Sequence, residues 1–414
     1  MATAVHELLA GGLMDILELT RLLVGVDSQN PGAFEPEITH LIARWAGEAG
    51  YEVTWLEPVP GRPNLVITLD RGAGPHVALS GHTDTKPIGD ALHLWQTPPL
   101  ELTVRGDRAY GLGATDMKGA VAAMMLALDR LAEDPNTPSG RTSLILTADE
   151  EQGSDAGAKA LVQHGLLPEV DAIVIGEPSG VDEPWEAVHL VSRGICCFEI
   201  DIHTAQGHSG LSQRFGRNAS LVAADLLHAF EDFRPTVATP GDVPCQPTVN
   251  PGILLQSGVS YGTWPGYCKV GMEIRLVPGM TRPELDAEVR ALVEKAIGSS
   301  ATWELRYLTN AQGWMAPVAI SAKAPIAVAC QRAAERVLGR AVPFAAFAGG
   351  TDATSFLGAA GIPTVTSLGP GWISVAHGAN ESVGVDQLGQ AVDIYAALVG
   401  EYAELVKEER EGTR

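Results

Sequence analysis

Short runs rich in β-branched residues alternate with helical stretches between about residues 53 and 177. The expected strands are 64–69, 76–80, 142–147 and 171–175, and the expected helices are 120–131 and 156–163. Such alternation predicts parallel strands joined by helical crossovers, so we expect an α/β fold with a mostly parallel sheet and flanking helices. Open α/β sheets bind ligands beyond the carboxyl ends of their strands, and residues that directly follow these runs are therefore candidates for a functional site.

The order of elements changes between about residues 189 and 308. There the pattern predicts a strand at 195–203, a helix at 218–230, strands at 251–256 and 268–277, a helix at 282–297 and a strand at 302–308. This β-α-β-β-α-β order is that of a ferredoxin-like α+β unit. Because strands and helices alternate again from about residue 325 to a last helix at 386–407, we expect residues 188–308 to be inserted into a larger domain formed by 1–187 and 309–414.

Charge and cysteine usage exclude several classes of protein. The chain has 50 acidic and 28 basic residues and a net charge of −22, so its surface repels nucleic acids and anionic membranes. It contains no uncharged apolar run near the roughly 18 residues that cross a bilayer, and the first 23 residues do not resemble a signal peptide. The five cysteines include no C-x-x-C pair, which argues against a disulfide framework and a thiolate zinc site. We expect a cytoplasmic protein.

Histidines and carboxylates are concentrated in five short segments. They are Ser80-Gly-His-Thr-Asp-Thr-Lys86, Gly113-Ala-Thr-Asp-Met-Lys-Gly119, Ala148-Asp-Glu-Glu-Gln-Gly-Ser154, Ile175-Gly-Glu-Pro-Ser179 and Val375-Ala-His-Gly-Ala-Asn-Glu381. Taken singly, a histidine is more often structural and an acidic pair after a strand is more often a solvated turn or helix cap. Three of the segments, however, follow expected strands. Two histidines and several carboxylates can hold two Zn²⁺, Mn²⁺ or Co²⁺ ions about 3.5–4 Å apart.

In this order the five segments resemble the signature of the M20 metallopeptidase family, which contains acetylornithine deacetylase, succinyl-diaminopimelate desuccinylase, carboxypeptidase G and the aminoacylases. The H-x-D, D-M-K-G, D-E-E-x-G-S and G-E-P motifs all occur without substitution, and the resemblance covers nearly the whole chain. It implies a zinc-peptidase type catalytic domain, and an inserted domain that serves as a lid and in dimerisation. It also implies two divalent ions, most often zinc with cobalt or manganese as alternatives, a small-molecule substrate and a homodimer.

The resemblance also implies roles for individual residues. Five would hold the metal ions: His82 and Glu177 the first ion, Glu151 and His377 the second, and Asp116 both. Asp84 would accept the proton on the second ring nitrogen of His82 and so fix its tautomer. Glu150 would be the general base, taking a proton from the metal-activated water and passing it to the leaving amine.

Two residues of the expected insert match family positions that contact the substrate. His208, in Ala205-Gln-Gly-His-Ser-Gly210, would act in the active site of the partner subunit and stabilise the oxyanion. The same segment does not form the nucleophile motif of a serine hydrolase, because it lacks the second glycine of G-x-S-x-G. Arg275 would bind a substrate carboxylate, for which a planar guanidinium is suited.

Thr351 and Asp352, in Gly349-Gly-Thr-Asp-Ala353, match a family segment that lines the substrate pocket. Two neighbouring positions depart from the family pattern: Gly262 stands where an asparagine is usual, and Thr354 stands where many relatives have arginine. We therefore expect recognition of the substrate carboxylate to differ from that of relatives.

The resemblance implies a metal-dependent hydrolase that cleaves the amide bond of an N-acyl amino acid or a small peptide-like compound. The departures at Gly262 and Thr354 leave open an aminohydrolase, dipeptidase or carboxypeptidase that uses the same metal site on an unusual substrate. A nucleotide-binding dehydrogenase is disfavoured because Asp116 replaces the third glycine of the fingerprint that begins at Gly111. A non-catalytic relative is disfavoured because all the expected ligands and the base are present.

Overall fold

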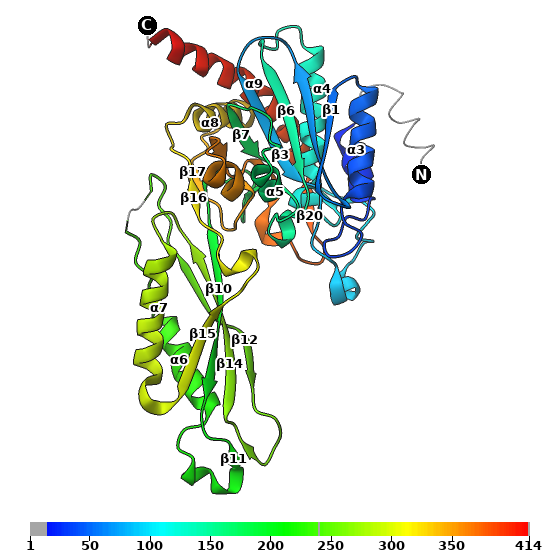
Figure 1. Ribbon diagram of the computed structural model, residues 1–414. Helices are drawn as coiled ribbons and strands as arrows, with labels where there is room; N and C mark the ends of the chain where they lie inside the picture. The colour runs from blue at the N-terminus through cyan, green and yellow to red at the C-terminus, as the bar shows by residue number, and fades with distance from the viewer. Residues whose placement is uncertain (1–14, 239–240, 413–414) are drawn as a thin grey trace. The chain divides into compact units, whose positions relative to one another are not determined.

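The computed structural model describes residues 15–238 and 241–412, which form two compact units (Figure 1). Unit 1 consists of the described residues up to Ser192 together with those from Ala319 onward. Unit 2 consists of those from Arg193 to Val318. One continuous stretch of chain is therefore inserted into the larger unit.

The insertion begins and ends later than the expected 188–308. Strand β9 (Val188–Ser192) pairs in parallel with β17 (Phe344–Ala346), which keeps β9 in unit 1. At the other end, Met315 forms an antiparallel bridge with Ile195, and residues 309–318 belong to unit 2. These pairings join segments far apart in the chain, so the local pattern does not reveal them.

A six-stranded sheet is the centre of unit 1. Its strands lie in the order β1 (Glu52–Val59), β2 (Arg62–Asp70), β6 (Arg141–Thr147), β3 (His76–His82), β7 (Ala172–Ile175) and β18 (Thr364–Val365). The last four are parallel, whereas β1 and β2 pair antiparallel with each other and β2 pairs antiparallel with β6. The four parallel strands fit the expected α/β sheet, and β1 and β2 add an antiparallel hairpin at one edge, because the short turn at Pro60 and Gly61 reverses the chain.

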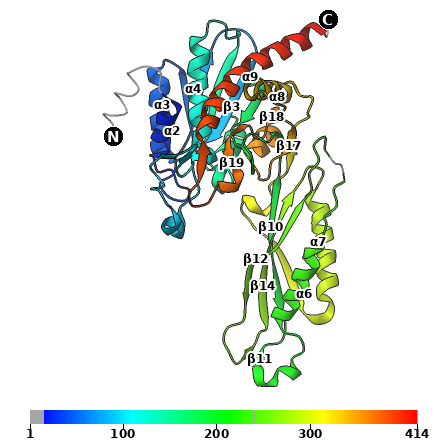
Figure 2. The same cartoon turned by 180° about the vertical axis from the view of Figure 1, so that it is seen from behind.

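Helices cover the faces of this sheet. They are α2 (Ile16–Val24), α3 (Pro36–Glu48), α4 (Gly119–Glu133), α5 (Ala158–Gln163), α8 (Pro325–Leu338) and α9 (Val385–Gly412). Figure 2 shows α4 and α9 side by side over one face. Because α4 is enclosed by the sheet and α9, apolar residues occur nearly all round it, and Ala120, Met124 and Leu128 have no exposed surface. Among the described helices, none combines the length and apolar character that crossing a lipid bilayer requires.

Short strands complete unit 1 around the ends of the main sheet. They form three small sheets: β16 (Val318–Ala319) with β9 and β17, β19 (Gly369–Trp372) with β8 (Pro178–Gly180), and β20 (Ser382–Gly384) with β5 (Arg108–Tyr110) and β4 (Thr103–Arg105). Two of these pairings join the segments after β7 and before α4 to the C-terminal part of the chain. They thereby bring the fifth histidine-bearing segment towards the other four.

Unit 2 has the element order expected for the insert. Its elements are β10 (Gly194–His203), α6 (Ala219–Glu231), β12 (Thr248–Ser257), β14 (Tyr267–Leu276), α7 (Arg282–Ile297) and β15 (Thr302–Tyr307), with a short hairpin of β11 (Gly207–His208) and β13 (Thr263–Trp264). The sheet order is β12-β14-β10-β15, and every pairing is antiparallel. Cys196, Phe198, Ile200 and Ile202 alternate along β10 and are buried in the core of this unit, as the two-residue period of a strand requires.

Candidate active site

Three neighbouring parallel strands of unit 1 end at the same edge of the sheet, and each is followed by candidate site residues. His82 is the last residue of β3, Glu150 and Glu151 lie just after β6, and Glu177 lies just after β7. In the sheet, His82 is level with Thr147 of β6, and Ser80 is level with Ile175 of β7. Asp116 comes from the turn Ala114–Lys118 that precedes α4. The structure therefore brings four of the five sequence segments together at one sheet edge, and three of them stand there because they follow strands, as the sequence indicated.

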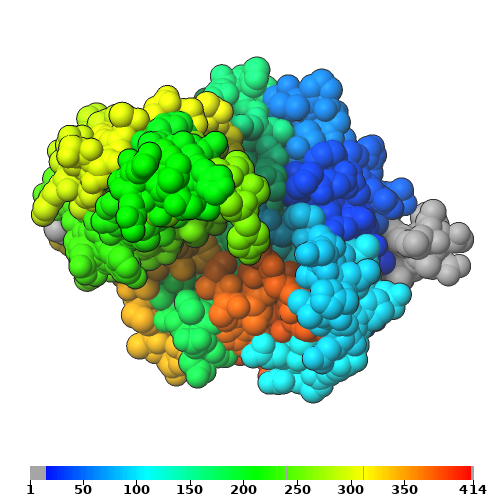
Figure 3. Space-filling view, turned by 90° about the horizontal axis from the view of Figure 1, so that it is seen from below, coloured from blue at the N-terminus to red at the C-terminus, as the bar shows by residue number. Residues whose placement is uncertain are grey.

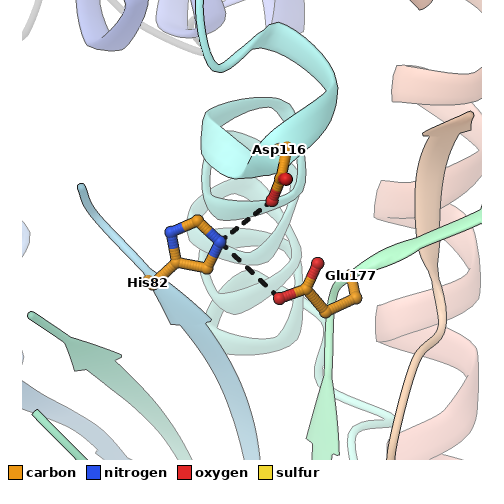
Figure 4. Close-up of side chains that lie close together, drawn as sticks. All are labelled: His82, Asp116 and Glu177. Atoms are coloured by element: carbon orange, nitrogen blue, oxygen red, sulfur yellow. Dashed lines mark hydrogen bonds and ion pairs between the residues drawn. The ribbon is translucent and has the colours of Figure 1, made fainter. Parts of the chain in front are cut away.

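His82, Asp116 and Glu177 form the first group of potential ligands (Figure 4). The Nε2 atom of His82 lies 3.0 Å from Oδ1 of Asp116 and 3.6 Å from Oε1 of Glu177. All three side chains are buried. Burial and the nearby Asp116 carboxylate raise the pKa of Glu177 well above its usual value. A divalent cation at this point would relieve the crowding of the two carboxylates.

Asp116, Glu151 and His377 form the second group. The Nε2 atom of His377 lies 3.0 Å from Oδ2 of Asp116 and 3.1 Å from Oε2 of Glu151. Asp116 thus presents one oxygen to each group. Within each group the potential ligand atoms lie within 4.8 Å of one another. Imidazole and carboxylate donors in this arrangement fit a pair of first-row divalent ions that share Asp116.

The segment that bears His377 is held against the chain that follows β3. The side chain of Asn380 accepts a hydrogen bond from the main-chain N–H of Gln96 at 2.7 Å and donates one to the carbonyl of Leu94 at 3.0 Å. Figure 3 shows these parts of the chain, coloured cyan and orange, side by side on the surface. The side chain of His377 is 47% exposed, whereas that of His82 is 1% exposed, so the two imidazoles differ strongly in their access to water.

Asp84 is placed beside His82, and two of its oxygen atoms face the second ring nitrogen of that histidine. The Nδ1 atom of His82 lies 2.9 Å from the main-chain oxygen of Asp84 and 3.5 Å from its carboxylate. The carbonyl is therefore the nearer acceptor, and it orients the ring so that Nε2 faces the potential metal position. The Asp84 carboxylate accepts the main-chain N–H groups of Glu150 and Glu151 at 3.3 and 3.2 Å. Asp84 consequently joins the end of β3 to the turn after β6.

A buried network that sequence reasoning missed supports this turn. Asn30 donates from Nδ2 to the carboxylates of Asp84 and Asp149 at 2.8 and 2.9 Å. Arg62 bonds both carboxylate oxygens of Glu35 and reaches Asp149 at 3.1 Å. Burial opposes ionisation of Asp84, but hydrogen bonds from His82 and Asn30 outweigh it and hold its pKa below the usual value. Nothing in the local pattern marks these residues, which are separated by up to 119 positions in the chain.

Glu381 holds the turn that presents Asp116. Its buried carboxylate accepts the main-chain N–H groups of Gly113, Thr115 and Asp116 at 3.0, 2.9 and 3.0 Å. Burial, together with the charge of Asp116, raises the pKa of Glu381 to about 8. The residue ends the fifth sequence segment, but the pattern there suggested no role for it, because the contact spans 265 residues or more.

Glu150 and Lys86 flank the second group. Glu150 is half-buried, and burial together with the charges of Asp352 and Glu151 raises its pKa well above the usual value. Lys86 lies against Glu151: its main-chain N–H is 3.2 Å from Oε1 and its ammonium nitrogen is 3.2 Å from Oε2. The expectation from sequence gave Lys86 no role, although it belongs to the first segment.

Thr351 and Asp352 lie in unit 1, but their polar atoms are used within the protein. Asp352 is 4% exposed, and its carboxylate accepts the hydroxyl groups of Thr147 and Ser154. Thr351 is 3% exposed, and its hydroxyl accepts the main-chain N–H of Ala353 at 3.2 Å. Thr147 and Ser154 stand on either side of the Glu150–Gln152 turn. Asp352 therefore braces the turn from inside the protein.

His208 and Arg275 belong to unit 2 and lie at opposite ends of its sheet. Arg275 is level with Ile195 near the start of β10, while His208 follows the end of that strand, where His203 is level with Tyr267. Eight residues of β10 span about 26 Å at roughly 3.3 Å per residue. Arg275 donates to Glu273 at 2.9 Å, and the exposed His208 ring accepts the N–H of Gly210 at 3.1 Å. These two residues are therefore too far apart within the unit to contact one small molecule.

The two positions that depart from the family pattern have different surroundings. Gly262 has a φ of +84° and lies at the turn before β13, where a left-handed backbone is required. An asparagine tolerates this conformation better than other side chains do, so the backbone suits either residue. Thr354 begins a helical turn, Thr354–Ala359, directly after Asp352 and Ala353.

A sequence model of peptidase family M20/M25/M40 matches residues 78–401. The chain belongs to this family. The match confirms the resemblance of the five segments and the expected class of enzyme, a metallo-amidohydrolase of the M20 type. It spans both units, including the whole of unit 2.

Solved structures of the same fold agree with this membership. An M20 family metallo-carboxypeptidase from Sulfolobus solfataricus has a TM-score of 0.76 and 19% identity, over 94% of this chain and 100% of that one. Human carnosine dipeptidase 1 has a TM-score of 0.73 and 19% identity, over 97% and 98%. A Bacillus subtilis protein, YXEP, described as a dinuclear metal binding peptidase of the M20 family, has a TM-score of 0.68 and 19% identity, over 94% and 98%. At these identities the likeness is one of fold.

The metal-free protein should lose stability as the pH rises from about 6.5 to 8. Burial opposes the charged form of His377, but hydrogen bonds to Asp116 and Glu151 outweigh it and raise its pKa from 6.5 to about 10. The pKa of Glu381 is raised from 4.5 to about 8. In this window both groups hold a proton in the folded chain that they lose on unfolding, so folding becomes less favourable as protons become scarce.

Urea unfolding in the presence of a chelator at pH 6.5, 7.2 and 8 would measure this slope. The variant His377→Gln should have a shallower slope, because only one of the two groups remains. A urea midpoint that stays constant or rises between pH 6.5 and 8 would contradict the raised pKa values of His377 and Glu381.

Proposed function

We propose that this chain is a two-metal hydrolase that cleaves the amide bond of an N-acyl amino acid or a small peptide-like compound. The single observation that carries the proposal is the position of Asp116, whose two carboxylate oxygens each face a histidine and a further carboxylate. In this proposal His82 and Glu177 hold one ion, Glu151 and His377 hold the other, and Asp116 holds both. A bound pair of divalent ions, zinc or alternatively cobalt or manganese, would polarise the substrate carbonyl and acidify a water towards neutral pH.

Glu150 is the proposed general base. It neighbours the ligand Glu151 in sequence, and its main-chain N–H is fixed by Asp84. Because its pKa is raised, the Glu150 carboxylate is a stronger acceptor for a proton from the attacking water. Glu150 would then donate this proton to the leaving amine. We propose that Asp84 and Asp352 act through the turn that they brace, so that Glu150 and Glu151 keep their relative positions.

The proposed assembly is a homodimer in which two residues of unit 2 serve different active sites. Arg275 would bind a substrate carboxylate and His208 would stabilise the oxyanion, and about 26 Å of sheet between them favours the use of His208 by the partner subunit. Strand β12 is an edge strand of unit 2, and its Ile253 and Leu255 are exposed, as is Leu221 on α6. An unpaired edge with exposed apolar side chains suits contact with a second copy of this chain.

A dipeptidase, carboxypeptidase or aminohydrolase with the same metal site is the second candidate. Gly262 and Thr354 favour it, because they stand where relatives have asparagine and arginine and so alter the groups available to bind a substrate carboxylate.

Location in the cytoplasm stays a prediction. The five cysteines are free, which agrees with a reducing compartment.

Removal of metal should abolish hydrolysis reversibly. Purified protein would be treated with a chelator, reloaded with Zn²⁺, Co²⁺ or Mn²⁺, and offered N-acetyl, N-succinyl and N-carbamoyl amino acids and dipeptides. We expect turnover to vanish on depletion and return on reloading, with N-acyl amino acids the best substrates. Preference for dipeptides would favour the second candidate, and undiminished turnover without metal would contradict both.

Replacing each of the adjacent glutamates should have a different effect. Glu150→Gln should lower kcat by several orders of magnitude while two ions remain bound, because only the proton acceptor is lost. Glu151→Gln should lose one ion, because an amide is a poorer ligand than a carboxylate. Metal content by atomic absorption, measured beside kcat, separates the two. Exchange of these phenotypes would reverse the assignment of base and ligand.

Complementation between inactive variants tests the role of His208 in the dimer. A mixture of His208→Ala and Glu150→Gln subunits forms dimers with one site that has both residues and one that has neither. With random exchange about half of the dimers are mixed, so activity should return to roughly a quarter of the wild-type value. Mass spectrometry would verify the mixed dimers. Their presence without activity would mean that His208 does not act across the interface.

A further inference from the structure

We infer that Lys86 makes the two metal sites unequal: its ammonium group competes with the ion at Asp116, Glu151 and His377, and this second site therefore binds metal more weakly than the first. The inference rests on the proposed function, since it takes both groups to be metal sites. It concerns a residue that the proposed chemistry does not use.

The competition follows from a shared oxygen atom. The Nζ atom of Lys86 lies 3.2 Å from Oε2 of Glu151, and the Nε2 atom of His377 lies 3.1 Å from the same oxygen. Nζ also donates to the main-chain oxygen of Glu151, so the ammonium group is held at two points of one residue. An ion bound by Oε2 at about 2.0–2.2 Å would lie no more than about 5.4 Å from Nζ. At that distance two positive charges repel strongly unless the lysine moves away.

Among the described residues, the first site has no such competitor. In the part of the chain that the structure describes, no lysine or arginine nitrogen lies within 4 Å of the carboxylates of Asp116 or Glu177. Its histidine, His82, is also buried, whereas His377 is 47% exposed. Both differences predict that the first site fills before the second, and only one of them depends on Lys86.

Lys86 also has a function in the metal-free protein. Glu150, Glu151 and Asp116 place three carboxylates around the second site, and burial without a counter-charge is costly for each. The ammonium group supplies one positive charge there. The same contact that stabilises the empty site therefore reduces the free energy gained when an ion enters it.

The side chain of Lys86 can be changed without removing the anchor of Glu151. Oε1 of Glu151 accepts the main-chain N–H of Lys86 at 3.2 Å, and a substitution leaves this bond in place. The Lys86 side chain is 30% exposed, so methionine of similar length can occupy the position. Lys86→Met removes the charge, while Lys86→Arg retains it.

The test is a metal titration of the depleted protein. Zn²⁺ would be titrated against a chromophoric chelator, which yields the stoichiometry and both dissociation constants. Wild type should bind two ions unequally. In Lys86→Met the dissociation constant of the second site should fall about tenfold to a hundredfold, which means tighter binding, while that of the first site changes by less than about threefold. Lys86→Arg should keep the second site weak. Lys159→Met is the matched control, because it removes another lysine paired with a carboxylate, Asp155, that belongs to neither group.

Thermal unfolding provides a second measurement that does not depend on activity. Lys86→Met should lower the midpoint of the metal-free protein and increase the rise in midpoint produced by saturating Zn²⁺. If the dissociation constant of the second site is unchanged or larger in Lys86→Met, while that of the first site is unchanged, the role of Lys86 is overturned. The proposed function would still stand. Absence of Zn²⁺ binding in wild type would instead overturn the proposed function.

Discussion

Asp116 presents one carboxylate oxygen to His82 and the other to His377, and both halves of the candidate site depend on this contact. Its position is set by the main chain, because Glu381 accepts the N–H group of Asp116 and two others of the same turn. Glu381 comes from the C-terminal part of unit 1, close to His377. The segment that supplies one histidine thus also orients the carboxylate that this histidine shares.

The crowding of carboxylates is the main electrostatic cost of this arrangement. Burial and mutual repulsion raise the pKa values of Glu150 and Glu177 well above the usual range. Cationic side chains offset part of the cost at the margins, with Arg62 beside Asp149 and Lys86 beside Glu151. At the centre the two histidines are the cationic partners of the carboxylates in the metal-free protein, because, although burial opposes the charged form, contact with Asp116 raises the pKa of both imidazoles. A divalent ion would take over this charge balance.

Much of the site could be predicted from the sequence because strand ends and motifs are local features. The runs before His82, Glu150 and Glu177 were short and apolar enough to indicate buried strands, and parallel strands bring their carboxyl ends to one edge. The element order of unit 2 followed from periodicity for the same reason. The β1–β2 hairpin was missed because β1 is an edge strand whose side chains are mostly exposed, which weakens its apolar pattern.

The groups that can bind metal, and their places along the strands, follow from the sequence, because residue type and local periodicity are properties of short segments. The contacts that hold these groups follow from the folded chain. The bonds from Asn30 to Asp149 and from Asp116 to Glu381 join residues 119 and 265 positions apart, and no local pattern encodes them. The same is true of the ammonium group of Lys86 against Glu151. The acceptor for His82 also depends on atomic positions, because its Nδ1 atom lies 2.9 Å from the main-chain oxygen of Asp84 and 3.5 Å from the carboxylate.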